Sequence, residues 1–467
     1  MAAERLAGLP RADVLLLLPS IPSTAAVLGP DSAWGAALEH WGVAVGAASS
    51  ADLLVATGGV PAAGALGAPM ILLPGARRLG RLRRAGYTVT TYRVRWISWH
   101  VVVATPDRRG PRLARRTWAP AGVGARGRVA RVLRPGAVSV ATLGGDGAPA
   151  TLRMSGAAPS SGVSRTCVAV DVRDARRRAA FLVPDAGGGV PTVVKAARSP
   201  GQESRGPREQ RVLGLLPDDG VTPRPLGAGH AGPVEWSAET AVRGRPLREL
   251  ESGHRELVLP VLETLAVWLG DVALRTAVPM DWRSAGAGDT TVALRGPAAG
   301  LGRLLTGLGD VPAVLSHGDL ASGHNVVVDR SGRAAVLDWE TAREHGLPLQ
   351  DLLPLLCSSL ARVHGRRHPE REGDHVLALA TGRSPESRWL FAQVAGYADR
   401  LGLLPASLGP LALLAWGHQA SMRQVRDELL ATAGLPAGKW TSLAERVLPR
   451  WEDEVGADWP QLRAHLH

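Results

Sequence analysis

Residues 313–340 read AVLSHGDLASGHNVVVDRSGRAAVLDWE, and this stretch decides the fold of the second half of the chain. An apolar run leads into His317–Asp319, a short loop reaches Asn325, and the β-branched run Val326–Val328 predicts a strand. Turn residues then reverse the chain, and a second apolar strand delivers Asp338. The sequence therefore predicts a hairpin that brings two aspartates and one asparagine to the same edge.

This set of side chains suits phosphoryl transfer from a magnesium nucleotide. One carboxylate can orient the hydroxyl of an acceptor, while a second carboxylate and an amide oxygen can hold a hard cation over the phosphates. Asn325 is the only asparagine in the chain and follows Asp319 by six residues, so chance is a poor explanation of its position.

The pattern His-Gly-Asp-Leu-x-x-x-x-Asn followed by Leu-Asp-Trp-Glu resembles the aminoglycoside phosphotransferase and choline kinase-like family, which comprises small-molecule kinases with the protein-kinase fold. The resemblance implies two catalytic residues, Asp319 as the base and His317 as the support of its loop. It also implies Asn325 and Asp338 as ligands of Mg²⁺. Pro348–Leu352 is similar to the family's Asp-Leu segment that opens the next helix. We therefore expect an α+β protein-kinase-like bilobal fold, with an antiparallel β small lobe and an α-rich large lobe, that uses ATP or GTP.

A second candidate site residue is Lys195, one of only two lysines in a chain with 52 arginines. It lies at the end of the apolar strand predicted at 192–196. The compact ammonium of lysine can reach between α- and β-phosphate oxygens where a guanidinium would not fit. Glu209, in a predicted helix at 207–216, is its expected partner, and Glu203 is the alternative.

Two further segments are expected to bind the nucleotide. No Gly-x-Gly-x-x-Gly pattern occurs between the second and third strands predicted for the small lobe, and the turn at 160–165 there resembles the Ser-rich turn that small-molecule kinases of this family use instead. Its candidate phosphate contacts are Ser161, Gly162 and Ser164. The stretch 235–244 fits the hinge between lobes, so adenine contacts are expected from Glu239 through Val242.

The first third of the chain predicts a small α/β Rossmann-like domain. Apolar runs at 13–19, 52–59 and 69–74 predict buried strands, with helical patterns at 32–42 and 76–85 between and after them. Leu79–Tyr92 loosely resembles the C-terminal half of S-adenosylmethionine-dependent methyltransferase folds. However, Pro19–Ser23 stands where that family has a glycine turn, and without glycine the backbone cannot approach a cofactor closely. We interpret this domain as a relic or an interaction module.

These patterns divide the chain into four segments. They are an α/β domain at 1–105, a basic linker at 106–136, a kinase-like N-lobe at 137–244, and a helical C-lobe at 245–467 with the catalytic loop at 315–340. The whole net charge of +12 falls within residues 1–134, which suggests either an acidic partner or compositional drift in an arginine-rich chain.

Helical spacing in the last half predicts a layer of helices and, between them, the acceptor site. The predicted helices cover 255–276, 298–308, 352–364, 389–401, 408–430 and 443–455, with a charged turn at 366–372. Proline at 260 would move the start of the first helix one turn later. Candidate wall residues of the acceptor site are Glu340, Glu344, His345, Asp399, His418 and Arg423.

The bulk properties are those of a cytoplasmic protein with reduced cysteines. Uninterrupted apolar runs are too short for a transmembrane segment, the cysteines Cys167 and Cys357 have no metal-ligand spacing, and no aromatic-interleaved basic motif of a nucleic-acid module is present. We expect an ATP- and magnesium-dependent phosphotransferase that acts on a hydroxyl of a small molecule. The alternative is a nucleotide-binding pseudokinase with a regulatory role. The acceptor and the oligomeric state are not readable from the sequence.

Overall fold

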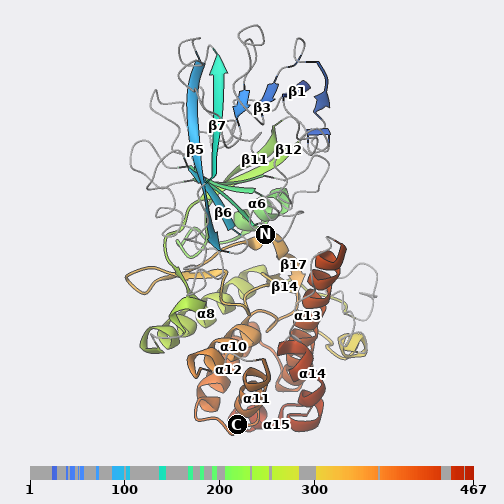
Figure 1. Ribbon diagram of the computed structural model, residues 1–467. Helices are drawn as coiled ribbons and strands as arrows, with labels where there is room; N and C mark the ends of the chain where they lie inside the picture. Colours follow the sequence, from blue (N-terminus) through green and yellow to red (C-terminus); the bar gives the residue numbers. More distant parts are fainter. Residues whose placement is uncertain are drawn as a thin grey trace. The chain divides into compact units, whose positions relative to one another are not determined.

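The computed structural model (Figure 1) describes residues 24–28, 38–39, 43–47, 51, 53–56, 70–72, 87–98, 101–105, 136–143, 167–171, 179–183, 192–196, 206–231, 234–251, 255–282, 301–365, 369–432, 443–456 and 458–466. Its internal contacts divide the chain into two units. The first comprises Met1–Gly214 and Pro223–Val242, and the second comprises Leu215–Thr222 and Arg243–His467.

The first unit contains a twelve-stranded sheet in the order β11-β12-β10-β9-β8-β6-β5-β7-β4-β3-β1-β2. Parallel pairs form at one end of it, β2 with β1, β1 with β3, and β3 with β4. These strands are β1 (Thr24–Leu28), β2 (Ala44–Val45), β3 (Leu53–Ala56) and β4 (Met70–Leu72). The predicted strands at 52–59 and 69–74 are therefore confirmed. The strand predicted at 13–19 and the helix predicted at 76–85 lie outside the described residues. The Rossmann-like domain stays a prediction.

Three longer strands continue the same sheet, namely β5 (Tyr87–Ser98), β6 (Val101–Thr105) and β7 (Gly136–Leu143). Strand β7 pairs antiparallel with both β4 and β5, and β6 pairs antiparallel with β8. Backbone hydrogen bonds thus connect the strands of the first 105 residues to those that follow residue 136. The proposed domain boundaries stay predictions, but the described strands on both sides of 106–136 belong to one sheet.

The remaining strands of this sheet are antiparallel throughout, as predicted for the small lobe. They are β8 (Cys167–Asp171), β9 (Ala179–Val183), β10 (Thr192–Ala196), β11 (Pro225–Ala231) and β12 (Val234–Thr240), with helix α6 at Gly206–Leu215. In the register, Lys195 of β10 stands opposite Ala180 of β9 and Ser237 of β12. Strand β11 was not expected, because its Pro- and Gly-containing sequence is typical of a loop.

The second unit carries two small antiparallel sheets. One consists of β13 (Arg245–Pro246), β15 (Val326–Val328) and β16 (Ala334–Val336), and the other of β14 (Val314–Ser316) and β17 (Arg343–Gly346). The predicted hairpin is β15 and β16, paired from Val326 with Val336 to Val328 with Ala334.

Helices make up the rest of the described part of the second unit (Figure 1). They are α7 (Leu247–Leu250), α8 (Arg255–Thr276), α9 (Gly302–Leu305), α10 (Leu352–Val363), α11 (Pro369–Ala380), α12 (Ser387–Leu401), α13 (Pro405–Thr432), α14 (Leu443–Glu454) and α15 (Pro460–Leu466). Most of the predicted helices are confirmed. Helix α8 begins before Pro260, which lies inside it, so the expected later start was wrong.

The charged turn predicted at 366–372 was also wrong, because α11 begins at Pro369. Proline fits the first turn of a helix, where its missing N–H has no intrahelical partner to lose. The charged residues from Glu370 to Glu372 lie in the first turn of α11, residues 366–368 lie outside the described part of the chain, and the later turns bury Val376, Leu377 and Leu379.

Helix α8 has the length and apolar composition of a membrane span over Glu256–Thr276. Helices α12 and α13 pass the same test only as a pair, bent by 112°. In the structure α8 packs on α12, β14 and α10, and buries Val258, Leu262 and Leu265. This is also the behaviour of a core helix, whose apolar residues are interrupted by charges at positions away from the core.

Tryptophans fill the core among the last helices. The ring centroids of Trp416 and Trp451 are 6.3 Å apart, and those of Trp451 and Trp459 are 5.2 Å apart in an edge-on arrangement. Phe391 of α12 meets Trp459 edge-on at 6.0 Å. All three indoles are buried, so this aromatic cluster joins α12, α13 and α14.

Strands β14 and β17 approach each other closely, and a mutation can test how tightly they pack. A Cβ added at Gly346 would overlap Ser316 Oγ and lie 2.5 Å from Ser316 Cβ. We expect Gly346→Ala to lower the free energy of unfolding by roughly 1–3 kcal/mol, the usual cost of overpacking, in urea denaturation. The control is Gly302→Ala, where a Cβ would meet nothing within 4 Å. Equal stability of the two variants would contradict the packing.

Candidate active site

The hairpin β15–β16 places Asn325 and Asp338 at the same end. Asn325 immediately precedes β15, and Asp338 follows β16 by two residues. The pair Val326 and Val336 closes the ladder at this end, and the N–H of Leu337 donates to the carbonyl of Asn325 at 2.7 Å. The backbone therefore fixes the two residues beside each other, as the sequence predicted.

The backbone of Asp338 adopts a conformation that is rare for residues other than glycine. Its φ of 65° and ψ of 61° lie in the left-handed region. Aspartate and asparagine tolerate this region better than most residues, and such backbone strain concentrates at functional sites. The turn brings Trp339 into the core directly after Asp338, which itself stays half-buried.

The amide of Asn325 is oriented by the candidate base. Its Nδ2 donates to the carbonyl oxygen of Asp319 at 2.9 Å and to Asp319 Oδ2 at 3.2 Å. Because Nδ2 is committed in this way, Oδ1 is the atom left for a cation. An amide oxygen together with the Asp338 carboxylate is a donor set that fits Mg²⁺, which prefers hard oxygen ligands.

His317 supports the loop from inside the core. It is completely buried, so it is a positioning residue that cannot touch a substrate. The N–H of Asp319 donates to Nδ1 at 3.3 Å, which assigns the ring proton to Nε2, and Nε2 then donates to the carbonyl of Leu337 at 2.8 Å. The ring centroid lies 4.7 Å from that of Trp339, with the two planes tilted by 56°. His317 thus links the loop that carries Asp319 to the strand end that carries Asp338.

Asp351 anchors the same loop through its backbone. Its two carboxylate oxygens accept the N–H groups of His317 at 2.6 Å and Gly318 at 2.8 Å. Burial raises the pKa of this carboxyl group, and the two backbone donors offset part of that effect. Asp351 lies in the Asp-Leu segment singled out in the sequence and is the N-cap residue of α10.

His418 packs on the loop from α13. A Cβ placed on Gly318 would lie 3.6 Å from His418 Nε2, and Gly318 itself has a φ of +84° that favours glycine. Burial, followed by the positive charge of Arg343, lowers the pKa of His418 to about 3. The imidazole is therefore neutral. We expected His418 in the wall of an acceptor site, but its side chain is buried.

A buried guanidinium holds the next part of the loop. Arg362 of α10 donates from Nη2 to Glu251 Oε1 at 2.9 Å and from Nη1 to the carbonyl of Ala321 at 3.1 Å. Gly323 lies so close that a Cβ there would be 3.2 Å from Arg362 Nη2. Glu372 of α11 approaches the same guanidinium at 3.4 Å. Sequence reasoning missed this cluster, since nothing in the pattern distinguishes Arg362 from the other arginines.

In the first unit, the predicted partner of Lys195 is confirmed. Lys195 Nζ lies 2.6 Å from Glu209 Oε1, and Glu209 is completely buried in α6. Glu239 is a second partner, with Oε1 2.9 Å from Nζ and only 5% of the residue exposed. The register could have revealed this contact, because Val193 faces Glu239 and side chains two residues apart on a strand share a face.

For the other candidate site residues named from the sequence, the structure gives only a part of the expected positions and contacts. The turn that contains Ser161, Gly162 and Ser164 lies outside the described residues, as does the alternative partner Glu203. Glu239 is the penultimate residue of β12, and Val242 is half-buried two residues beyond the strand, so an adenine contact from this segment stays a prediction. Among the other proposed wall residues, Glu340 and Glu344 are half-buried and His345 and Asp399 are exposed, while the side chain of Arg423 is not described.

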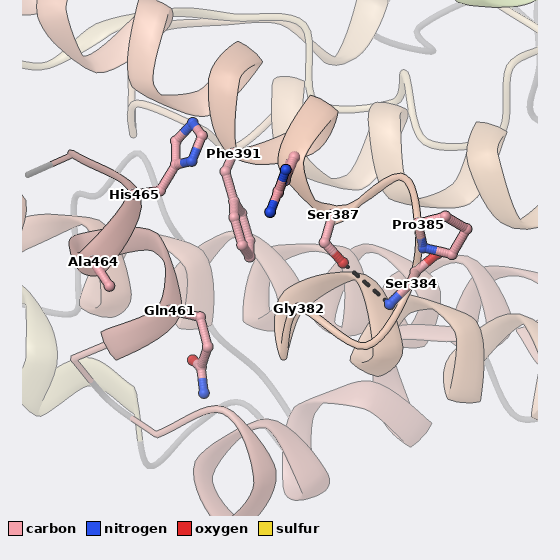
Figure 2. Close-up of a pocket in the computed structure, with 9 residues that line it drawn as sticks. Gly382, Ser384, Pro385, Ser387, Phe391, Gln461, Ala464 and His465 are labelled. Carbon is pink, nitrogen blue, oxygen red and sulfur yellow. Dashed lines mark hydrogen bonds between the residues drawn. The ribbon is translucent and has the colours of Figure 1, made fainter.

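A hollow of about 520 Å³ occurs away from these residues, between α12 and α15. Phe391 and Gln461 line it, together with the turn at Ser384 (Figure 2). It lies at the end of the second unit where the chain terminates, whereas β14 and β17 lie at the other end (Figure 1). The hollow is therefore separate from the catalytic hairpin.

The later part of the chain has a protein-kinase-like fold. It consists of an antiparallel sheet with a lysine–glutamate pair and a helical lobe that carries Asp319, Asn325 and Asp338. Residues 171–397 match the sequence model of the phosphotransferase enzyme family. No curated protein sequence matches the chain.

Solved structures of similar proteins carry related descriptions. An ethanolamine kinase of Plasmodium vivax is 12% identical, with 60% of this chain and 81% of that chain covered and a TM-score of 0.35. An aminoglycoside phosphotransferase from Streptomyces rimosus is 15% identical, with 51% and 88% covered and a TM-score of 0.31. A type VIII aminoglycoside-3'-phosphotransferase is 21% identical, with 47% and 88% covered and a TM-score of 0.26.

The buried His418 predicts a pH dependence of stability. Its folded pKa of about 3 lies below the unfolded value of 6.5, so the unfolded state binds the proton more readily and stability is lost as pH falls below 6.5. Between pH 7 and pH 5 we expect the wild type to lose about 2 kcal/mol more than His418→Leu, at 1.36 kcal/mol per pKa unit. Urea denaturation at both pH values measures this difference. Parallel losses in the two proteins would contradict a neutral, buried His418.

Proposed function

We propose that the chain is an ATP- and magnesium-dependent phosphotransferase that phosphorylates a hydroxyl group of a small molecule. The observation that carries the proposal is the hydrogen bond from Asn325 to Asp319 beside Asp338. It orients an amide oxygen for a cation and holds the carboxylate of Asp319 next to that cation's ligands. The match of residues 171–397 to the phosphotransferase enzyme family supports the same reaction class.

Each residue has a defined task in this proposal. Asn325 and Asp338 would hold Mg²⁺, which would neutralise phosphate charge when bound. Asp319 orients the acceptor hydroxyl and receives its proton, while its other oxygen stays fixed by Asn325 Nδ2. Lys195, oriented by Glu209, steadies the α- and β-phosphates.

The acceptor class is proposed from the family alone. Amino alcohols, aminoglycosides and sugars each present a primary or secondary hydroxyl of the kind that Asp319 could deprotonate. Ethanolamine and an aminoglycoside are the acceptors to try first, because the names of the similar solved structures include an ethanolamine kinase and aminoglycoside phosphotransferases.

A nucleotide-binding regulator without phosphoryl transfer is the second candidate, and Glu239 is the observation that favours it. Two carboxylates contact the ammonium of Lys195, and the second of them competes with phosphate oxygens for this ammonium, which would hinder the alignment of a bound nucleotide for transfer. The two functions differ in a simple way, because both bind nucleotide but only the first consumes it in the presence of an acceptor.

Calorimetric titration with ATP and GTP, with and without Mg²⁺, tests the proposed site. We expect binding that depends on Mg²⁺ in the wild type, that is lost in Asp338→Ala, and that persists in the control Asp310→Asn, an exposed carboxylate before β14. Absence of binding for both nucleotides would overturn the proposal and the alternative together.

Transfer is then measured by release of ADP in a panel of hydroxyl acceptors, followed by ³¹P NMR of the product. Asp319→Asn should keep nucleotide binding and lower the turnover by roughly 10²–10⁴-fold, the usual contribution of a general base. Nucleotide binding without acceptor-dependent release of ADP would favour the regulatory function.

Glu239 provides a separate test of where the phosphates bind. Removal of its charge by Glu239→Gln should tighten ATP binding several-fold, because one repulsive carboxylate beside Lys195 disappears. The matched control is Glu235→Gln, four residues earlier on the same face of β12. Calorimetric dissociation constants report the effect, and weaker ATP binding in Glu239→Gln would place the phosphates elsewhere.

A further inference from the structure

Two histidines and one glutamate converge where three helices meet, outside the catalytic hairpin. His364 is the C-cap residue of α10, His375 lies in α11, and Glu386 is the N-cap residue of α12. One potential ligand atom from each residue lies within 4.8 Å of the other two. The imidazole centroids are 5.0 Å apart with their planes tilted by 49°, and His364 Nε2 is 2.8 Å from Glu386 Oε1.

A simple ion pair does not account for this geometry. Despite its short distance to Glu386, the buried Nε2 of His364 makes no hydrogen bond of acceptable geometry among the described residues. Two imidazoles whose nitrogens lie close to one carboxylate are instead an arrangement that suits a bound cation.

The carboxylate is held in place by a neighbouring hydroxyl. Ser384 Oγ donates to Glu386 Oε2 at 2.6 Å, which leaves Oε1 turned toward His364. The backbone of Ser384 is fixed in turn by Ser387 Oγ at 3.2 Å, in the turn drawn in Figure 2. Such outer contacts orient metal ligands and commonly accompany a metal site.

We propose that His364, His375 and Glu386 form a structural site for a divalent transition metal, with zinc as the best fit. Two imidazoles and one carboxylate are a common zinc ligand set, and a water molecule would complete the tetrahedron. Imidazole donors favour zinc, nickel or copper over magnesium and calcium, so this site differs in chemistry from the oxygen ligands at Asn325 and Asp338.

The site would stabilise the support of the catalytic loop. His364 follows Arg362 by two residues, and Arg362 holds the carbonyl of Ala321. On α11, Glu372 lies one turn before His375, on the same helix face, and approaches Arg362. A metal that joins His364 to His375 therefore fixes the two helices whose side chains meet at Arg362.

The test uses the full chain without a histidine tag, stripped with a chelator and dialysed. Competition against a chromophoric chelator should show one saturable zinc site, and elemental analysis should show one zinc per chain after gel filtration. Excess Mg²⁺ or Ca²⁺ should not displace the zinc. X-ray absorption should show two imidazole ligands at about 2.0 Å. Zinc should raise the melting temperature, because it binds the folded state.

Variants locate the site. His375→Gln and Glu386→Gln should abolish saturable binding, whereas His465→Gln, an exposed histidine of α15, should leave it unchanged. Ser384→Ala removes no ligand and should weaken zinc binding by roughly tenfold or more, as loss of an outer contact does. It also serves if a ligand variant does not fold.

Two results would overturn the proposal. One is a wild-type chain that binds no zinc at a saturable site. The other is zinc binding of wild-type strength in Ser384→Ala and in the ligand variants that fold, which would place the metal elsewhere. Neither result bears on magnesium-dependent nucleotide binding, which is measured separately.

Discussion

The candidate site depends on two hydrogen bonds that the Asp351 carboxylate accepts from backbone N–H groups. It fixes the peptide units of His317 and Gly318, and everything that follows in the loop inherits that position. His317 then reaches Leu337, and Asn325 reaches Asp319. A carboxylate buried in this way is costly unless its oxygens are satisfied, so the anchor and the loop stabilise one another.

Charge is organised differently in the two units. In the second unit, the buried groups next to the catalytic loop are balanced locally, as Arg362 is by Glu251. In the first unit, Lys195 faces two carboxylates. Buried ion pairs contribute less to stability than their Coulomb energy suggests, but they fix side-chain positions. For Lys195, that means a defined orientation.

The parts of the structure that were predictable share a physical reason. The hairpin was readable because strand and turn residues alternate sharply there, and the pair of Lys195 and Glu209 because a rare residue ends a strand just before a helix. Helix α11 was missed because its first turns are charged and its apolar residues come late. The roles of Arg362 and His418 depend on contacts between residues far apart in the chain, and a local pattern carries no information about these.

The distribution of these contacts along the chain has a consequence for folding. The edge of the hairpin sheet comes from Arg245–Pro246, the anchor of the loop from Asp351, and the covering imidazole from His418. Closure of such long loops is slow, because entropy is lost before the contacts repay it. On a ribosome the hairpin would emerge long before the helix that covers it. The candidate site is thus completed late, after most of the helical layer has been synthesised.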